Sequence, residues 1–492
     1  MVPTMKHHLC PSLPATSARR LGAAVSLAVV VLLAGCASSA GIGSQASVLD
    51  PQAIGLAQPT GNRPAEPLVA SDWWRSWGDA QLSAVIEQAL QSQPSLKVAQ
   101  ARLRRAEAAT SGEEAADGLK INGSADVTRQ RFSATNIYPP PLGGSTRTLA
   151  NAQLAGSWEF DFFGLHRSAI EAAVGSERAA AADLQAARNV LASNVAQTYV
   201  QLGRLLAQRE VAQLALTQRE QMLGLIRQRV DAGLDTRVEL KQGEGALPDA
   251  RVQIEQLDEQ IVAARHALAA LAAQPPKHYA QLRPDLQSLK PLALPEMLPA
   301  DLLGRRADIT AARWRIEAAT QGVSVAKAQF YPNVSLTAFI GLSSIGLDRL
   351  INSGSQQYGI GPAIHLPIFD AGRLRAQLRT RNADLDAAVE SYNGAVLEAV
   401  RDTADQLNAR QSLERQREQQ AQSRSAAEAA YDIATQRYRA GLSNYLTVLS
   451  AETTLINQRR QTVDLQARAL STQVALVRAL GGGYTADEPL AR

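Results

Sequence analysis

The chain has 492 residues, of which 4% are aromatic and 20% are charged, and its formal net charge is +4. This length excludes only a small scaffold, and the abundance of Ala, Leu, Gln, Arg and Glu is typical of long helices or coiled coils. Without its first 35 residues the chain keeps a net charge of about +1, so we expect no nucleic-acid partner.

Residues 1–35 have the layout of a secretory signal. Lys6, Arg19 and Arg20 precede the apolar run LGAAVSLAVVVLLAG, and no acidic residue is present. A basic start followed by a short apolar run is typical of exported proteins. The run is too short, and is followed too soon by small polar residues, to predict a helix that spans a membrane.

The signal ends in LLAGC, which looks like the lipobox of bacterial lipoproteins. Cys36 is therefore the expected site of lipid attachment, and the acyl chains would tether the protein to a membrane. The alternative is an ordinary secreted protein with a free cysteine. Because Cys10 would leave with the signal, no disulfide is expected.

The rest of the sequence divides into two repeats and three irregular segments. The apolar pattern and the proline and glycine clusters predict the following order: a lipid-anchored tail (36–78), a first repeat (79–274), an irregular equatorial linker (275–297), a second repeat (298–480) and a C-terminal tail (481–492). Trp73, Trp74 and Trp77 are expected to pack at the base of the helix that starts near Asp79.

Each repeat reads as helix, strand, strand, helix, helix. The alternating segments at about 119–132, 147–162, 331–344 and 356–369 predict the strands. In the first of them Leu119, Ile121 and Val127 share one face, and polar residues occupy the other. The fold class is thus mainly α with a contribution from membrane strands.

Long helices follow each pair of strands and end in the same three residues, AGL. Gly233 and Gly441 lie 208 positions apart. A glycine that can adopt positive φ ends a helix and makes a turn, so we expect tip turns at about 232–236 and 440–444.

Amphipathic strands on an exported, lipid-tethered chain indicate a transmembrane barrel, since a partly paired strand cannot lie in lipid. Four strands cannot close around a channel, whereas three chains would supply about twelve. We therefore predict a homotrimer in which a 12-stranded barrel continues into a long α-helical barrel. The alternative is four soluble strands beside a helix bundle.

Three long motifs carry a resemblance to a known family: LLGRRADITAARWRIEAATQGVSVAKAQFYPNVSLTAFIGLSS, YGIGPAIHLPIFDAGRLRA and SWEFDFFGLHRSAIEAA. They resemble the outer-membrane factor family, the TolC-like exit ducts of tripartite efflux systems, and the lipobox points to its NodT and OprM type of lipoprotein. The resemblance implies a trimer in the outer membrane of a Gram-negative bacterium that works with a periplasmic adaptor and an inner-membrane RND-type pump. One departure is Ala307, where the family usually has proline, and a slightly altered helix start is expected there.

The resemblance also implies roles for residues at the two turns. In the family the turns contact the adaptor, which assigns this contact to Gly233, Leu234, Gly441 and Leu442. Acidic residues beyond the turns often form a gate, and the matching positions here are Glu239, Thr447 and Ser450. We expect one acidic tier at Glu239 and a neutral tier at the other two. The alternatives are that the glycines only turn the chain and that Glu239 is a solvated helix charge.

The sequence contains no recognisable catalytic or metal-binding motif. Its histidines lack metal-ligand spacing, no P-loop is present, and LGGGYT near the end reads as a helix stop. We therefore expect no enzyme activity and no cofactor besides the lipid on Cys36. The predicted function is an outer-membrane exit channel that passively conducts small molecules such as drugs. The exit duct of a type I secretion system and a periplasmic coiled-coil scaffold are the alternatives.

Overall fold

A computed structural model describes residues 39–50, 69–292, 294 and 304–485. Cys36 and the signal lie outside these residues. The chain forms two compact units, each made of three segments. Of the described residues, the strand unit contains 39–46, 108–175 and 316–388, and the helical unit contains those within 47–107, 176–315 and 389–485.

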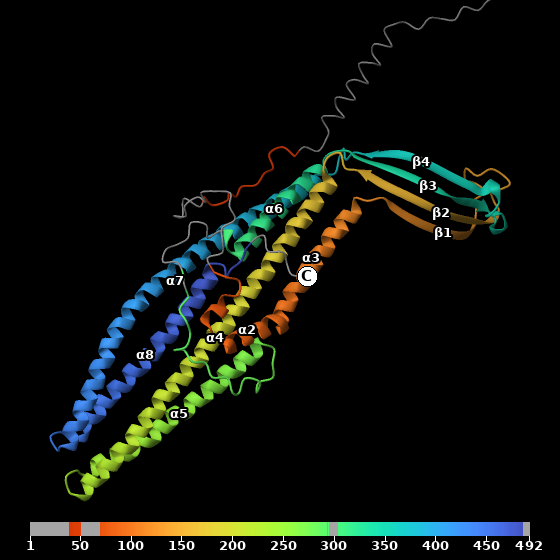
Figure 1. Cartoon of the computed structure of the whole chain (residues 1–492). Helices are drawn as coiled ribbons and strands as arrows, with labels where there is room; N and C mark the ends of the chain where they lie inside the picture. The colour runs from red at the N-terminus through yellow and green to blue at the C-terminus, as the bar shows by residue number, and fades with distance from the viewer. Residues whose placement is uncertain (1–38, 51–68, 293, 295–303, 486–492) are drawn as a thin grey trace, which may run out of the picture. The chain divides into compact units, whose positions relative to one another are not determined.

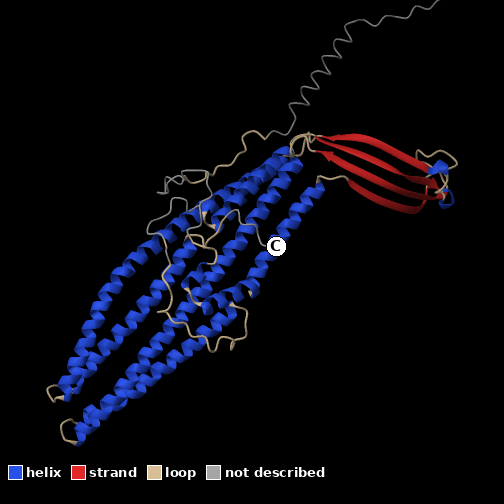
Figure 2. Ribbon diagram, in the orientation of Figure 1, coloured by secondary structure: helices blue, strands red, loops and turns tan. Residues whose placement is uncertain are grey.

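The strand unit contains a four-stranded antiparallel sheet in the order β1-β2-β3-β4 (Figure 2). The strands are β1 (Lys120–Arg131), β2 (Thr146–Phe160), β3 (Asn333–Ile345) and β4 (Gln356–His365). The central pair, β2 and β3, joins the two repeats through a register that runs from Leu149↔Ile345 to Phe160↔Val334. Within the described residues, β1 and β4 therefore each have a neighbour on one side only.

The two faces of the sheet differ in polarity. One row of facing residues crosses all four strands, with Gly123 opposite Leu154, Leu154 opposite Ile340, and Ile340 opposite Tyr358. Leu154, Ile340 and Tyr358 are 56%, 64% and 82% exposed. On the other face Asn151 Nδ2 donates to Asp126 Oδ2 at 3.1 Å and Ser343 Oγ donates to Asn151 Oδ1 at 2.7 Å. Alternation at period two thus produces one apolar and one polar face.

Helices make up the remainder of both repeats (Figure 1). They are η2 (Trp73–Trp77), α2 (Ala80–Ser92), α3 (Pro94–Ala116), α4 (Leu165–Asp231), α5 (Arg237–Leu271), α6 (Ala307–Ala328), η4 (Leu347–Arg349), η5 (Ser353–Ser355), α7 (Arg373–Arg439) and α8 (Tyr445–Ala479). The predicted order of helix, strand, strand, helix and helix is confirmed. At 1.5 Å per residue, the 67 residues of α4 and of α7 each span about 100 Å.

No helix in the described part of the chain is long and apolar enough to cross a membrane.

The helices before the strands agree with the sequence pattern in the first repeat and differ from it in the second. In the first repeat Gln93 separates α2 from α3, as Pro94 predicts, because the residue before a proline is disfavoured in the α conformation. In the second repeat the helix was expected from about 298, but residues 304–306 precede it and it begins at Ala307. There Arg306 pairs with Asp308, with Nη2 to Oδ2 at 2.7 Å. This ion pair joins the residue before α6 to the first turn of the helix.

The core of the helical unit lies around the predicted tryptophans. Trp73 and Trp77 are 1% and 0% exposed, and their rings meet edge to face at 5.9 Å. Asp79 begins α2 by accepting hydrogen bonds from Gln81 N and Leu82 N. Its other oxygen accepts from the buried Tyr199 hydroxyl at 2.6 Å. The tryptophans therefore anchor the start of the first repeat, as predicted.

Candidate functional site at the helical turns

The two turns of the helical unit end their first helices in the same way. Gly233 has φ +69° and Gly441 has φ +76°. Leu234 N donates to Arg229 O at 2.8 Å, and Leu442 N donates to Arg437 O at the same distance. These are the long-range hydrogen bonds of a Schellman motif, which requires a left-handed residue. The prediction that these glycines end the helices is confirmed.

The second helix of each turn starts with a polar cap. Thr236 and Glu239 form a capping box, in which Thr236 N donates to Glu239 Oε2 at 2.9 Å. The hydrogen bond from the Thr236 side chain is the main cause that lowers the pKa of Glu239. In the other turn Asn444 Oδ1 accepts from Thr447 N at 3.2 Å and from its hydroxyl at 2.9 Å. Glu239 and Thr447 therefore occupy equivalent cap positions, and Ser450 lies exposed one turn beyond Thr447.

Apolar side chains are exposed on both turns. Leu234 and Leu442 are 65% and 68% exposed, and Val238 and Leu446 are 61% and 59% exposed. Leu442 lies 208 positions after Leu234, and Leu446 lies 208 positions after Val238. Exposed apolar residues that cluster on a surface mark sites of protein interaction. The repeat thus gives both turns a similar surface.

A polar contact that the sequence analysis missed joins the two turns. The hydroxyl of Tyr438, which is fully buried, donates to Asp235 Oδ2. Arg229 Nε lies 3.0 Å from the same carboxylate oxygen, and its guanidinium lies 4.7 Å from the centre of the Tyr438 ring. Burial first, and then Asp235, raises the pKa of the Tyr438 hydroxyl. We call this trio the turn lock. Because hydrogen bonds to an ionised carboxylate are stronger than neutral ones, the lock holds the two helix pairs together.

A second, deeper contact lies between the same helix pairs. Arg219 Nε of α4 lies 3.1 Å from Glu452 Oε1 of α8, and Arg219 Nη1 donates to Ala246 O of α5 at 3.1 Å. Glu452 is only 5% exposed. Burial raises the pKa of Glu452, and the nearby Arg219 partly opposes this effect. The pair therefore connects three helices at a place with little solvent.

Apolar packing fills the space between these polar contacts. A cluster of buried residues joins α4 to α7 and α8 and consists of Met222, Ile226, Ala434, Tyr438, Tyr445 and Val448. Since a buried cluster excludes water, it strengthens the hydrogen bonds beside it. Together these contacts hold the helix pair of α4 and α5 against the helix pair of α7 and α8.

The residues of the turn lock can be compared with the equivalent residues of the other repeat. At the position of Asp235 the second repeat has Ser443, and at the position of Tyr438 the first repeat has Val230. Two of the three lock residues, Asp235 and Tyr438, are therefore at positions where the repeats differ, whereas the second repeat has Arg437 at the position of Arg229.

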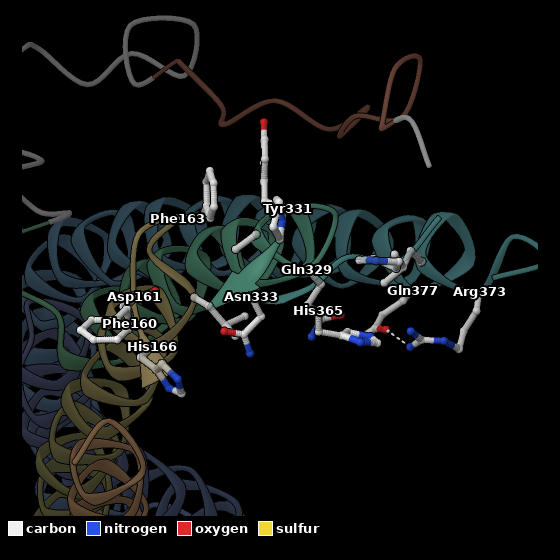
Figure 3. A pocket seen from close by; sticks show the side chains of 15 residues that line it. Phe160, Asp161, Phe163, His166, Gln329, Tyr331, Asn333, His365, Arg373 and Gln377 are labelled. Atoms are coloured by element: carbon white, nitrogen blue, oxygen red, sulfur yellow. Dashed lines mark hydrogen bonds between the residues drawn. The ribbon is translucent and has the colours of Figure 1, made fainter. Parts of the chain in front are cut away.

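The strand unit contains a cavity of about 350 Å³ where strands end and helices begin (Figure 3). It is lined from the ends of β2, β3 and β4 and the first turns of α4 and α7. His166 Nε2 lies 2.9 Å from Glu159 Oε2. Figure 3 shows Phe163 and Tyr331 on the side opposite His166 and His365. Among the described residues no group of three or more His, Cys, Asp or Glu could hold a metal ion.

Comparison with known proteins shows which family this chain resembles. The model of the family described as outer membrane efflux protein matches residues 85–274 and 298–482. The fusaric acid resistance protein FusA of Burkholderia cepacia is 38% identical over 366 residues, which cover 73% of this chain and 68% of FusA. The multidrug resistance outer membrane protein MdtQ of Escherichia coli O157:H7 is 32% identical over 472 residues, covering 93% of this chain and 97% of MdtQ.

A solved structure agrees with the sequence relatives. The outer membrane protein VceC of Vibrio cholerae superposes with a TM-score of 0.80 at 38% identity, covering 86% of this chain and all of VceC. The structural likeness thus extends over most of this chain. The chain belongs to the outer membrane efflux protein family.

Proposed function

We propose that this chain is the outer-membrane exit channel of a tripartite efflux pump and passively conducts small molecules such as drugs to the exterior. The observation that carries the proposal is the four-stranded sheet with one exposed apolar face and one polar face. Three copies joined through β1 and β4 would close about twelve strands, with the polar face around an aqueous path. This closure would make the protein a homotrimer, and a passive channel of this kind would have no enzyme activity.

The lipobox supports an anchor in the same membrane. Cys36 follows LLAG at the end of an apolar run, so its acylation would place the chain on the outer membrane of a Gram-negative bacterium. The covalent lipid would be its only cofactor. The relatives named for multidrug and fusaric acid resistance favour small molecules as cargo.

The exposed turns are suited to a protein partner. Gly233, Leu234, Gly441 and Leu442 would contact a periplasmic adaptor, which would connect the channel to an inner-membrane RND-type pump. This assignment is supported by the exposure of Leu234 and Leu442, each of which follows a glycine that carries no side chain. A passive duct needs such a pump, because the energy for transport must come from a partner.

The gate would combine two devices at these turns. Glu239 would supply an acidic tier, and Thr447 and Ser450 a neutral polar tier, as rings of three in the trimer. The turn lock of Arg229, Asp235 and Tyr438 would hold the helix pairs in the closed arrangement. Opening would then require the Tyr438 hydroxyl to leave Asp235.

The test is planar-bilayer conductance of the purified, lipidated chain, with the oligomer size checked in the same detergent. Tyr438→Phe removes one hydroxyl and should raise the mean conductance of the trimer several-fold. Tyr279→Phe makes the same chemical change in the linker and is the matched control. A monomer without conductance would refute the channel, and equal conductance of Tyr438→Phe and the native trimer would refute the lock.

A further inference from the structure

Charge on the apolar face of the sheet is confined to two arginines of β1. The pairing register places this face at the odd-numbered positions of β1 and at the even-numbered positions of β2, β3 and β4. At these positions β2, β3 and β4 carry no Asp, Glu, Lys or Arg. β1 carries Arg129 and Arg131, and it is exposed along its whole length. Arginine on the lipid face of a membrane barrel is destabilising at mid-depth and is tolerated near the interfaces with water.

The two arginines lie at the loop end of the sheet. At one end the four strands adjoin α3, α4, α6 and α7, and at the other end residues 132–145 and 346–355 connect them in pairs (Figure 1). Arg131 is the last residue of β1. On the same face of the neighbouring strand, Thr148 lies opposite Arg129 and Thr146 lies opposite Arg131. Two guanidinium groups and two hydroxyls thus occupy one corner of an otherwise apolar face.

The apolar band below this corner has the height of a hydrocarbon layer. On β2 the band runs from Phe160 to Ala150, which is ten steps along the strand and about 34 Å at 3.4 Å per step. Strands of membrane barrels tilt by about 40°, so the band would be about 26 Å tall, and the apolar band of such barrels is about 25 Å. Arg129 lies opposite Thr148, the next residue of β2 on this face. The arginines therefore lie at the level of the lipid headgroups.

The end of β1 is held in place by the hairpin that follows it. Phe132 is 7% exposed, and its ring lies edge to face with that of Tyr138 at 5.0 Å. Phe132 N donates to Ser145 O at 2.9 Å, and Gly144 N donates to Phe132 O at 3.1 Å. Side chains two positions apart on a strand point to the same side, about 7 Å apart at their Cα atoms. Both guanidinium groups can therefore reach one ligand.

No acidic residue neutralises this pair of charges. Within the described parts of the chain, neither Arg129 nor Arg131 has an ion pair or a side-chain hydrogen bond. The nearest acid on β1, Asp126, lies on the polar face, where it accepts from Asn151. Arg147 differs from the pair, because it lies opposite Gln130 on the polar face and donates to Ser145 Oγ at 3.3 Å. Guanidinium groups bind phosphate oxygens through two parallel hydrogen bonds, which makes phosphate the favoured ligand.

We propose that Arg129 and Arg131, together with the hydroxyls of Thr146 and Thr148, bind a phosphate of a lipid headgroup in the outer leaflet. The inference rests on the proposed function, because a channel with its helices in the periplasm places the loop end of the sheet at the outer surface. Lipopolysaccharide fills that leaflet, and its lipid A carries phosphate next to the acyl chains. The acyl chains would cover the apolar band, and the phosphate would lie on the arginines. β1 is the first strand of the sheet, so each bound lipid would lie where two copies join in the proposed trimer.

Native mass spectrometry of the full, lipidated trimer tests the site with phosphorylated lipid A as the probe. Arg129→Gln/Arg131→Gln should weaken binding at least tenfold. Arg129→Lys/Arg131→Lys keeps both charges but loses the paired donors, so it should weaken binding less. Arg147→Gln is the matched control, since it removes an arginine at the same level from the polar face, and it should bind like the native trimer. Native affinity in the double glutamine variant, with its trimer visible in the same spectrum, would overturn the proposal.

Two further probes identify the source of the phosphate. Lipid A without its phosphates keeps the acyl chains and should bind the native trimer at least tenfold more weakly. Equal affinity for this lipid would overturn phosphate recognition. Millimolar inorganic phosphate should leave the phosphorylated lipid bound, and displacement by it would identify free phosphate as the ligand and overturn the lipid assignment.

Conductance of the same preparations separates this inference from the proposed channel. A native chain that forms no trimer and does not conduct would refute the channel and this inference with it. A native trimer that conducts, with equal lipid A binding in the double glutamine variant, would refute only the headgroup site.

Discussion

Replacing Arg219 with alanine should loosen the contact between the two helix pairs. The substitution removes the charged partner of Glu452 and leaves a carboxyl group that is 5% exposed. A buried carboxylate without a partner is unstable, so the group will take up a proton instead. The free energy needed to protonate Glu452 therefore sets an upper limit on the stability that Arg219→Ala removes from this contact.

The limit follows from the ordinary pKa of 4.5 for this carboxyl. At pH 7.5 protonation costs up to about 4 kcal/mol, and at pH 6 about 2 kcal/mol, since each pH unit corresponds to 1.36 kcal/mol. Breaking a buried pair by removing one partner typically costs about 3–5 kcal/mol. We therefore expect a loss of about 3–4 kcal/mol at pH 7.5 that shrinks to at most about 2 at pH 6.

Hydrogen–deuterium exchange of the amides in α8 around Glu452 measures this loss as a local opening free energy. A loss of 3 kcal/mol corresponds to about a hundredfold lower protection after correction for the intrinsic exchange rate. Arg204→Ala is the control, since its partner Asp464 is 40% exposed and also accepts from Gln208. That control should cost less than about 1 kcal/mol. The double variant Arg219→Met/Glu452→Leu should recover most of the protection.

The dependence on pH is the sharpest part of this prediction. If Arg219→Ala lowers protection equally at pH 6 and pH 7.5, Glu452 is not the group that becomes unstable. If Arg204→Ala has the same effect as Arg219→Ala, burial does not determine the strength of these pairs.

Further predictions concern the turns and the native pair. Gly441→Ala forces a side chain into positive φ and should lower the free energy of local unfolding at this turn by about 1–2 kcal/mol. Gly224→Ala, seven residues before the end of α4, should instead stabilise that helix by about 0.5–1 kcal/mol; amide exchange measured at the turn and around residue 224 separates the two. Because the pKa of Glu239 is lowered in the folded chain, its support of α5 is present above its unfolded pKa and is lost as pH falls through the lower folded value. Amides at the start of α5 should then exchange faster in acid, while those at the Asn444 cap should not. Burial raises the pKa of Glu452, so the native contact between helix pairs should be most stable in acid and should weaken as pH rises above the unfolded pKa; a native protection that increases over this range would contradict the sign. Leu442→Asp should abolish binding of the proposed adaptor without changing the trimer, and a pull-down with the adaptor that gives native yields would exclude Leu442 from the contact.

Much of the fold could be predicted because it depends on local periodicity. Alternation over 119–132 predicted β1, and the AGL triplets predicted where α4 and α7 end. Helix starts were less predictable. The start of α6 at Ala307 depends on the pair of Arg306 with Asp308, and a pairing of side chains is not visible in an apolar pattern.

The candidate site was only partly predictable, because its main contacts join residues far apart in the chain. Tyr438 and Asp235 are 203 positions apart, and Arg219 and Glu452 are 233 apart. One part of the site has a local signal. The sequence TRVE at 236–239 has the pattern of a capping box, and it explains why the Glu239 carboxylate binds its own turn.

The C-terminal LGGGY shows another limit. It was predicted to stop a helix, and Gly482 N does donate to Val477 O at 2.9 Å. The glycines also permit close packing, since a Cβ on Gly482 would lie 2.1 Å from Asn189 Oδ1. A helix stop can be predicted from the glycines themselves, whereas the close packing at Gly482 depends on Asn189, which is far away in the sequence.

The register of the sheet has a consequence for the order in which this protein is built. The pairs β1–β2 and β3–β4 join neighbouring strands, whereas β2 and β3 are separated by α4, α5, the linker and α6. Contacts between distant residues form late, because closing a long loop costs conformational entropy before any contact is gained. The two hairpins can therefore fold during export, but the middle of the sheet must wait for the second repeat. Until that moment each hairpin carries only half of the apolar face.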